Sequence, residues 1–351
     1  MNIKALKYLS PITFYVLAYM CFTHTGWWVW ATVVYAFILI PLFELCIKTN
    51  EKNMELAQEE VVKKDKVYDY MLYLFVLFQF VALYYFLNSF NTHNVSTNTI
   101  LGRVITMGLL CGIFGINVAH ELGHRNNAFE QFLAKAALLT SLYIHFFIEH
   151  NKGHHKNVAT PNDPSSARLN EPVYTFYCRT IIYSYLSAWH IANDEMKKKG
   201  KPKYHFTNEM LQAHCIQILF VVLIYWVFGL TIMYYFLTAA LLGILLLETV
   251  NYIEHYGLQR KQTAPGKFER ALPIHSWNSS HIIGRIMLFE LSRHSDHHYM
   301  ASRKYQILQH HNNAPQLPTG YPGSMILAMV PPIWFYVMNN KIKKLQKMNE
   351  V

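Results

Sequence analysis

Charged residues are scarce in this sequence and absent from long parts of it. Asp, Glu, Lys and Arg make up only 15% of the 351 residues, whereas 52% are hydrophobic and 15% aromatic. No charged residue occurs in residues 8–43, 70–102, 104–119 or 210–247. A soluble core does not need uninterrupted runs of this length, whereas a helix that crosses a bilayer needs about 20 apolar residues. The sequence therefore predicts an all-α, polytopic membrane protein.

Cysteine pairs and glycine-rich cofactor motifs are missing as well. The chain has five cysteines, none of them in a CxxC pair, and no glycine-rich dinucleotide fingerprint. These absences argue against disulfides, zinc ribbons and iron–sulfur clusters. Any electrons for redox chemistry must then come from another protein. The net charge is +10, but no basic helix or aromatic-basic motif points to nucleic acid.

The charge-free runs accommodate three helical hairpins, which together make a six-transmembrane helical bundle. We expect a single integral-membrane domain over residues 1–351, with a cap formed by residues 120–210 and 253–351. The expected spans are residues 8–24, 27–47, 68–89, 100–119, 211–229 and 232–252.

The distribution of Lys and Arg predicts the orientation of the bundle. All of the 31 basic residues except Arg103 lie in the two tails or the two long loops. Because positive charge stays cytoplasmic, both termini and the cap are expected on the cytoplasmic side of the inner membrane. Arg103, near the outer end of the fourth span, can snorkel to the surface.

Histidines gather on that same predicted side. Nine of the 19 histidines form four clusters, in the stretches NVAHELGHR, EHNKGHH, NYIEHYG and LSRHSDHHYM. Their residues are His120 and His124; His150, His154 and His155; His255; and His294, His297 and His298. Ordinary polar loop histidines do not account for three clusters of the forms HxxxH, HxxxHH and HxxHH on one membrane face.

The spacing within the clusters predicts metal binding. Histidines four apart share a helix face, so each such pair can present two imidazoles to one metal. Adjacent histidines point in divergent directions, which suits two metals. Zinc sites take about four ligands, and nine imidazoles exceed one such site. Neutral imidazole also suits iron, which reacts with oxygen beside an apolar interior. HELGH alone matches the zinc-protease helix, with Glu121 as the base, but leaves seven histidines unexplained.

Carboxylates recur beside the histidines. Metal-bound imidazoles usually donate their second N–H to a carboxylate or carbonyl, and the acids are assigned this supporting role as a group. One of them could instead bridge two metals. Asp163, in ATPNDP, either tethers the loop that covers the site or forms a plain Asx turn. The residues of this group are Glu121, Glu149, Asp163, Glu254 and Asp296.

The motifs resemble those of the integral-membrane histidine-box oxygenases, which include desaturases, hydroxylases and alkane and xylene monooxygenases. NYIEHYGL, HHKNVATPNDPSSAR, HSWNSSH and APQLPTGYPGSM are characteristic of the membrane-bound alkane 1-monooxygenase (alkane hydroxylase) family. The resemblance implies a non-haem di-iron centre with all nine clustered histidines as ligands. It also implies O2 as co-substrate and electrons from NAD(P)H through a reductase and a rubredoxin or ferredoxin.

The function implied by this resemblance is hydroxylation of the terminal methyl group of a medium- or long-chain n-alkane to a 1-alkanol. Xylene-type oxidation of methyl-aromatics, and fatty-acyl desaturation or hydroxylation, remain alternatives because they share the ligand set. A metal carrier without catalysis is the alternative from another class. Carriers usually place ionisable ligands within the spans, whereas these clusters lie outside or at the edge of the spans.

Overall fold

The computed structural model describes residues 3–91 and 95–349, so the part of the predicted second turn at residues 92–94 lies outside it. The described chain is almost entirely helical, as predicted, and its one sheet is a short hairpin. It divides into two compact units. Unit 1 comprises residues 1–35, 66–153 and 185–247, and unit 2 comprises residues 36–65, 154–184 and 248–351.

Unit 1 contains most of the helices in the first half of the chain. They are α1 (Ile12–Thr23), α2 (Ala31–Val34), α5 (Val67–Asn88), α6 (Thr97–Leu110), α7 (Asn117–Gly123), α8 (Ala128–Leu139) and α9 (His145–Glu149). Helices α11 (Val173–Lys198) and α12 (Glu209–His255) contribute to both units.

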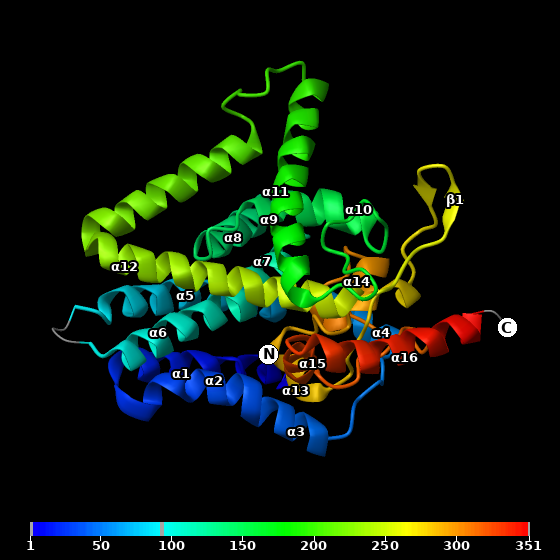
Figure 1. Cartoon of the computed structure of the whole chain (residues 1–351), viewed down its shortest axis with the longest axis horizontal. Helices are drawn as coiled ribbons and strands as arrows, with labels where there is room; N and C mark the ends of the chain where they lie inside the picture. Colours follow the sequence, from blue (N-terminus) through cyan, green and yellow to red (C-terminus); the bar gives the residue numbers. More distant parts are fainter. Residues whose placement is uncertain (1–2, 92–94, 350–351) are drawn as a thin grey trace. The chain divides into compact units, whose positions relative to one another are not determined.

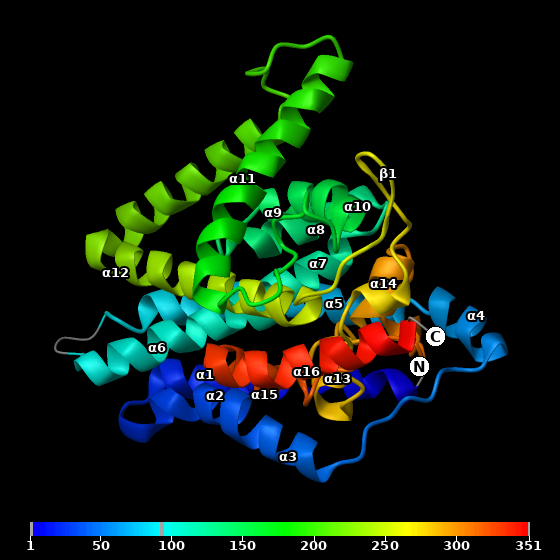
Figure 2. The ribbon, with the colours of Figure 1, turned by 45° about the vertical axis from the view of Figure 1, so that its right-hand side comes forward.

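Unit 2 contains the remaining helices and the β-hairpin. Its helices are α3 (Ile40–Cys46), α4 (Leu56–Lys64), α10 (His155–Asn157), α13 (Ile282–Met287), α14 (His294–Tyr299), α15 (Tyr321–Ala328) and α16 (Pro331–Asn349). Strands β1 (Gln262–Ala264) and β2 (Lys267–Phe268) pair antiparallel. Figure 2 shows this hairpin extending away from helix α14 of the same unit.

Among the described residues, five helical segments are long and apolar enough to cross a membrane: Ala5–Thr23, Gly26–Cys46, Val67–Asn88, Thr97–Gly123 and Glu209–His255. The first four match the first four expected spans. The expected fifth and sixth spans both lie in the 47-residue α12, where two helices meet at Gly229 (φ 83°). A further candidate exists if α15 and α16, bent by 120°, form one broken span.

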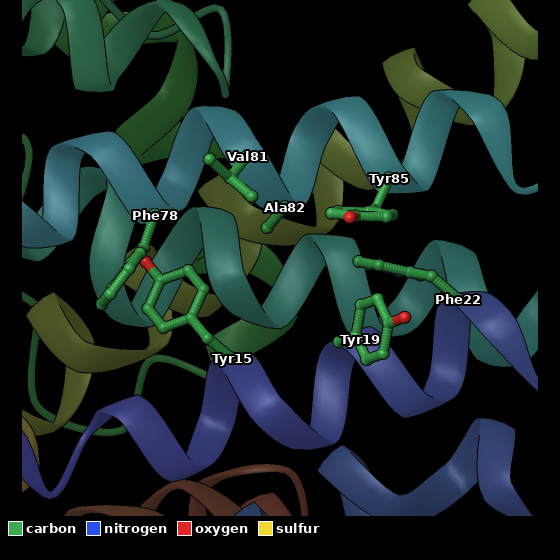
Figure 3. Close-up of a pocket in the computed structure, with 7 residues that line it drawn as sticks. All are labelled: Tyr15, Tyr19, Phe22, Phe78, Val81, Ala82 and Tyr85. Carbon is green, nitrogen blue, oxygen red and sulfur yellow. The ribbon is translucent and has the colours of Figure 1, made fainter.

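Helices α1, α5 and α6 run side by side in unit 1 (Figure 1). Their shared core is aromatic, with the Phe75 and Phe114 rings stacked 5.7 Å apart and Tyr15 against both. A small apolar pocket of about 80 Å³ lies between α1 and α5 (Figure 3). It is lined by Tyr15, Tyr19, Phe22, Phe78, Val81, Ala82 and Tyr85.

Helix α12 approaches the fourth span so closely that only glycine fits at the contact. A Cβ atom at Gly108 would lie 2.7 Å from Leu242, and one at Gly243 would lie 2.5 Å from Cys111. Such small-residue contacts allow close helix packing in membranes. The span then passes through a π-helical turn, Cys111–Ile116, directly before α7, which carries His120 and is followed by His124. π-helical turns of this kind are frequent at functional sites.

Arg103, which is expected to snorkel, directs its guanidinium to the ends of two neighbouring spans. Its side chain is buried, and the guanidinium donates hydrogen bonds to the carbonyl oxygens of Cys21, His24 and Ser89. These carbonyls lie at the ends of α1 and α5. Arg103 therefore joins two helix ends whose last carbonyl groups lack partners within the helices.

In unit 2, α3 packs against α13 and α15 around a buried carboxylate. Glu44 is 3% exposed, and one of its oxygens accepts a hydrogen bond from the Gly284 backbone N–H at 2.9 Å. The carboxylate lies so close to Gly320 that a Cβ atom there would be 1.9 Å from Oε2. Glu44 thus links the end of the second span to the segments on both sides of the last histidine cluster.

Candidate metal centre

The first histidine group lies in unit 1, where α7 ends and the π-helical turn η5 (His150–His154) begins. The rings of His120 and His150 are 4.4 Å apart, and those of His120 and His124 are 5.0 Å apart. His124 and His150 complete the triangle at 5.2 Å. The rings of His120 and His124, four residues apart at the end of α7, therefore lie close together, as the i, i+4 spacing predicts.

The second group lies in unit 2 and is more deeply buried. His154, His255, His294 and His298 each offer a ring nitrogen, and these four nitrogens lie within 4.8 Å of one another. The Nε2 atoms of His294 and His298, one helical turn apart on α14, are separated by 2.9 Å. The Nε2 atoms of His154 and His298 are 3.2 Å apart, as are those of His255 and His294.

These separations fit a metal ion better than a chain of hydrogen bonds. A ring nitrogen of neutral imidazole carries one proton or one lone pair, so His298 Nε2 cannot satisfy both His154 and His294. Ligand nitrogens about 2.1 Å from a metal are roughly 3.0–3.4 Å from each other in tetrahedral or octahedral geometry. The observed separations of 2.9–3.2 Å agree with this range.

Burial also keeps the His298 ring in the neutral form that binds metals. Burial, together with the four neighbouring imidazoles, holds the pKa of His298 well below its ordinary value. The ring is therefore neutral at pH 7, which is the form that binds metals. His155 and His297, the other halves of the two doublets, meet each other with their Nε2 atoms 3.0 Å apart, and the His155 ring also lies 4.5 Å from that of His298.

Asp163 orients His154. Its Oδ2 atom is 2.9 Å from His154 Nδ1 and accepts a hydrogen bond of 2.6 Å from the Ser166 hydroxyl. Burial raises the pKa of Asp163, but the adjacent His154, together with Ser166 and His255, outweighs this effect and the net pKa lies below its ordinary value. The carboxylate is therefore ionised and fixes the Nδ1–H tautomer, which directs the Nε2 lone pair of His154 toward the group. A plain Asx turn does not account for these contacts.

Glu254 contacts the group from the end of α12. Its Oε2 atom is 3.2 Å from His294 Nε2, the nitrogen that faces the other imidazoles. The other oxygen accepts a 2.6 Å hydrogen bond from the Tyr321 hydroxyl. Tyr321 was not predicted from the sequence as a site residue, although it lies inside the quoted stretch APQLPTGYPGSM. A tyrosine between Gly320 and Pro322 does not indicate from sequence which carboxylate its hydroxyl will contact.

The other three acids have partners other than the four imidazoles of unit 2. Glu121 pairs with Arg125, and Glu149 accepts a long 3.4 Å hydrogen bond from Ser187. Asp296 is fully buried and binds Arg303 at 2.7 Å and His311 Nε2 at 2.7 Å. Asp296 therefore anchors α14, the helix that presents His294 and His298.

An all-α chain with membrane-length helices and buried polyhistidine groups defines the class of histidine-rich integral-membrane metalloproteins. The family profile described as "Fatty acid desaturase" matches residues 94–325. Alkane 1-monooxygenase 2 of Pseudomonas aeruginosa is 35% identical over 318 residues, covering 90% of this chain and 84% of that protein.

Two further relatives are also alkane 1-monooxygenases. Alkane 1-monooxygenase of Pseudomonas putida is 37% identical over 91% of this chain and 79% of its own length. That of Acinetobacter baylyi is 38% identical over 87% and 74%. The chain belongs to the alkane 1-monooxygenase family, within the fatty acid desaturase family. It is thus a membrane monooxygenase of the alkane-hydroxylating type.

Proposed function

We propose that this protein hydroxylates the terminal methyl group of medium- or long-chain n-alkanes to 1-alkanols. The observation that carries the proposal is the four-histidine group of unit 2, whose nitrogens converge in a buried site in a chain similar to alkane 1-monooxygenases. O2 is the co-substrate. The electrons come from NAD(P)H through a reductase and a rubredoxin or ferredoxin.

The cofactor in this proposal is a pair of non-haem iron ions. All nine clustered histidines are the proposed ligands. Four of them converge in unit 2: His154, His255, His294 and His298. The other five are His120, His124, His150, His155 and His297. When bound, the irons activate dioxygen for insertion into a C–H bond. Imidazole-rich sites without converging thiolates suit iron among the first-row metals.

The supporting residues of unit 2 hold these ligands in place. Asp163 keeps the proton of His154 on Nδ1, and Arg303 holds Asp296 and with it the helix that carries His294 and His298. Glu254 lies with one oxygen beside His294 Nε2, which supports a role as a carboxylate ligand or a proton acceptor at the site. Burial of all four imidazoles excludes water from them.

The membrane supplies the substrate. Alkanes dissolve in lipid, so a route from the bilayer interior costs little desolvation. The pocket between α1 and α5 is too small to hold such a chain, because its volume of about 80 Å³ is only about half of the roughly 150 Å³ cavity that accommodates one benzene molecule. We place the protein in the inner membrane, with termini and histidines cytoplasmic, as its Lys and Arg distribution predicts.

The test is product analysis. Membranes that contain the protein are incubated with O2, NADH, a rubredoxin with its reductase, and a mixture of n-alkanes and xylene. Products are identified by gas chromatography–mass spectrometry. We expect primary alkanols, which are absent with His294→Ala and retained with His190→Ala, a control at an exposed histidine of α11.

The other outcomes separate the alternatives. A benzylic alcohol without alkanols would move the assignment to methyl-aromatic oxidation. An olefinic or hydroxylated product formed only from added fatty-acyl substrates would support a desaturase or an acyl hydroxylase. No product despite full iron occupancy and a competent electron donor would contradict the proposal and favour a metal carrier.

A further inference from the structure

A tyrosine and a histidine outside the nine clustered ligands form a defined proton-transfer pair in unit 1. Tyr185, on α11, donates its phenolic proton toward Nε2 of His214, on α12, with 3.0 Å between the two atoms. The direction is fixed because the other ring nitrogen of His214 lies 2.6 Å from the Met210 carbonyl oxygen, which can only accept. His214 Nε2 therefore carries a lone pair that can take the tyrosine proton.

This pair lies in a continuous series of ring contacts that ends at a candidate iron ligand. The Tyr185 ring is 5.4 Å from the His145 ring, and the His145 ring is 4.6 Å from that of Tyr143. The series continues through Phe146, stacked 5.7 Å from Tyr143 and 4.7 Å from His150. All of these residues belong to unit 1.

The two ends of the series differ in exposure. His150 is 4% exposed at the inner end. At the outer end, the half-buried Trp189 lies with its ring 5.4 Å from that of His214. Trp189 follows Tyr185 by four residues on α11 and shares its helix face. An electron can thus pass between the protein surface and His150 through rings in contact.

The middle of the series carries no charge that would oppose oxidation of Tyr185. Burial, with a smaller contribution from the nearby His214, lowers the pKa of His145 to about 4. The His145 ring is therefore neutral at pH 7. A cation in that position would disfavour loss of an electron from the neighbouring tyrosine by Coulomb repulsion of the developing positive charge.

We propose that Tyr185 and His214 form a redox relay that quenches an oxidising equivalent at the iron centre when no alkane is bound. The relay rests on the proposed function. Tyr185 loses one electron, which passes through the rings of His145, Tyr143 and Phe146 and reduces the centre by one electron. The phenolic proton moves to His214 Nε2, which leaves a neutral tyrosyl radical beside an imidazolium.

Recovery of Tyr185 needs one electron and one proton. A one-electron reductant of the thiol class supplies an electron at the Trp189 edge of α11, and His214 gives its proton back to Tyr185. The relay does not feed normal turnover, because tyrosine yields an electron only to a strong oxidant. Iron held by the clustered histidines would supply such an oxidant when dioxygen reacts and no alkane is present. The relay therefore protects the histidine ligands during futile oxygen reduction.

The relay is tested by trapping the radical. Iron-loaded protein in lipid nanodiscs is reduced, mixed with oxygenated buffer without alkane, and frozen for electron paramagnetic resonance. We expect a tyrosyl signal that narrows in protein made with ring-deuterated tyrosine. The signal should be lost in Tyr185→Phe and in His214→Gln, and retained in Tyr183→Phe. Tyr183 is a matched control because it lies on the same helix but is 57% exposed and outside the series.

A second measurement separates protection from structural damage. Tyr185→Phe should keep the wild-type iron content and initial rate of alkanol formation, but should lose activity severalfold faster during preincubation with O2 and reductant without alkane. Peptide mass spectrometry should then show more oxidised His150.

The outcomes distinguish the relay from the function on which it rests. A wild-type protein that forms alkanols but gives no tyrosyl signal overturns the relay alone, as does an equal signal in Tyr185→Phe. Equal inactivation rates of Tyr185→Phe and Tyr183→Phe also overturn it. A wild-type protein that binds iron and consumes O2 without forming alkanol contradicts the proposed function, and the relay fails with it.

Discussion

Replacing Asp163 by Asn should weaken iron binding without removing a ligand. One carboxylate oxygen accepts from His154 and Ser166, and the other accepts from the Ser165 backbone N–H at 3.1 Å. An amide has only one acceptor oxygen. Either orientation of the amide in Asp163→Asn therefore turns its NH2 group toward a donor, and the negative charge that favours the Nδ1–H tautomer of His154 is lost.

Loss of a carboxylate that supports a metal-bound histidine typically lowers metal affinity ten- to a hundredfold, or about 1.4–2.7 kcal/mol. Because Asp163 is 3% exposed, solvent cannot replace the lost acceptor, and we expect the upper half of that range. The assay is anaerobic titration of iron-depleted protein with Fe²⁺ against a competing chelator. Asp194→Asn is the control, since Asp194 is an exposed acid that pairs with His190 on α11. An unchanged iron affinity in Asp163→Asn would refute the reasoning.

Three further predictions concern stability. Gly320→Ala should lower the unfolding temperature because the added Cβ atom overlaps the Glu44 carboxylate. The decrease should be smaller in a Glu44→Ala background. Equal decreases in both backgrounds would show that this contact is not the cause. Chelation of iron should lower the unfolding temperature of the wild type but much less that of His294→Ala, measured by calorimetry, because a metal that binds only the folded state stabilises it. Arg103→Gln should reduce the yield of folded protein in size-exclusion chromatography, since it leaves buried carbonyl oxygens without donors, whereas Arg103→Lys should recover part of the yield.

The membrane helices were predictable because their physical cause is local. In a bilayer, backbone groups must bond within the segment, so an uninterrupted apolar run has one regular solution. The four runs before residue 120 became helices close to their predicted bounds. The π-helical turn at Cys111–Ile116 was not predictable, because its extra residue is stabilised by packing against other helices and has no composition signal.

Histidine spacing predicted contacts only where the backbone is an α-helix. The i, i+4 rule placed His120 beside His124 on α7 and His294 beside His298 on α14. It does not describe His150 and His154, which bound the π-helical turn η5. His154 joins the four-histidine group of unit 2, and His150 lies with the histidines of α7. An i→i+5 backbone alters the angle between side chains four apart, so the rule loses its premise there.

Proximity in sequence was a poor guide to which acids support the ligands, and helix geometry explains why. Residues one or two apart on a helix do not share a face, so an acid beside or two after a ligating histidine points elsewhere. Glu121 accordingly pairs with Arg125, and Asp296 with Arg303. Asp163, nine residues beyond His154 in a loop, is free of that constraint and folds back to bind its ring. Glu254 likewise serves not its neighbour His255 but His294, across the site. Tertiary structure thus brings Asp163 and Glu254 to imidazoles that are not their sequence neighbours, and these two contacts could not be predicted from the sequence.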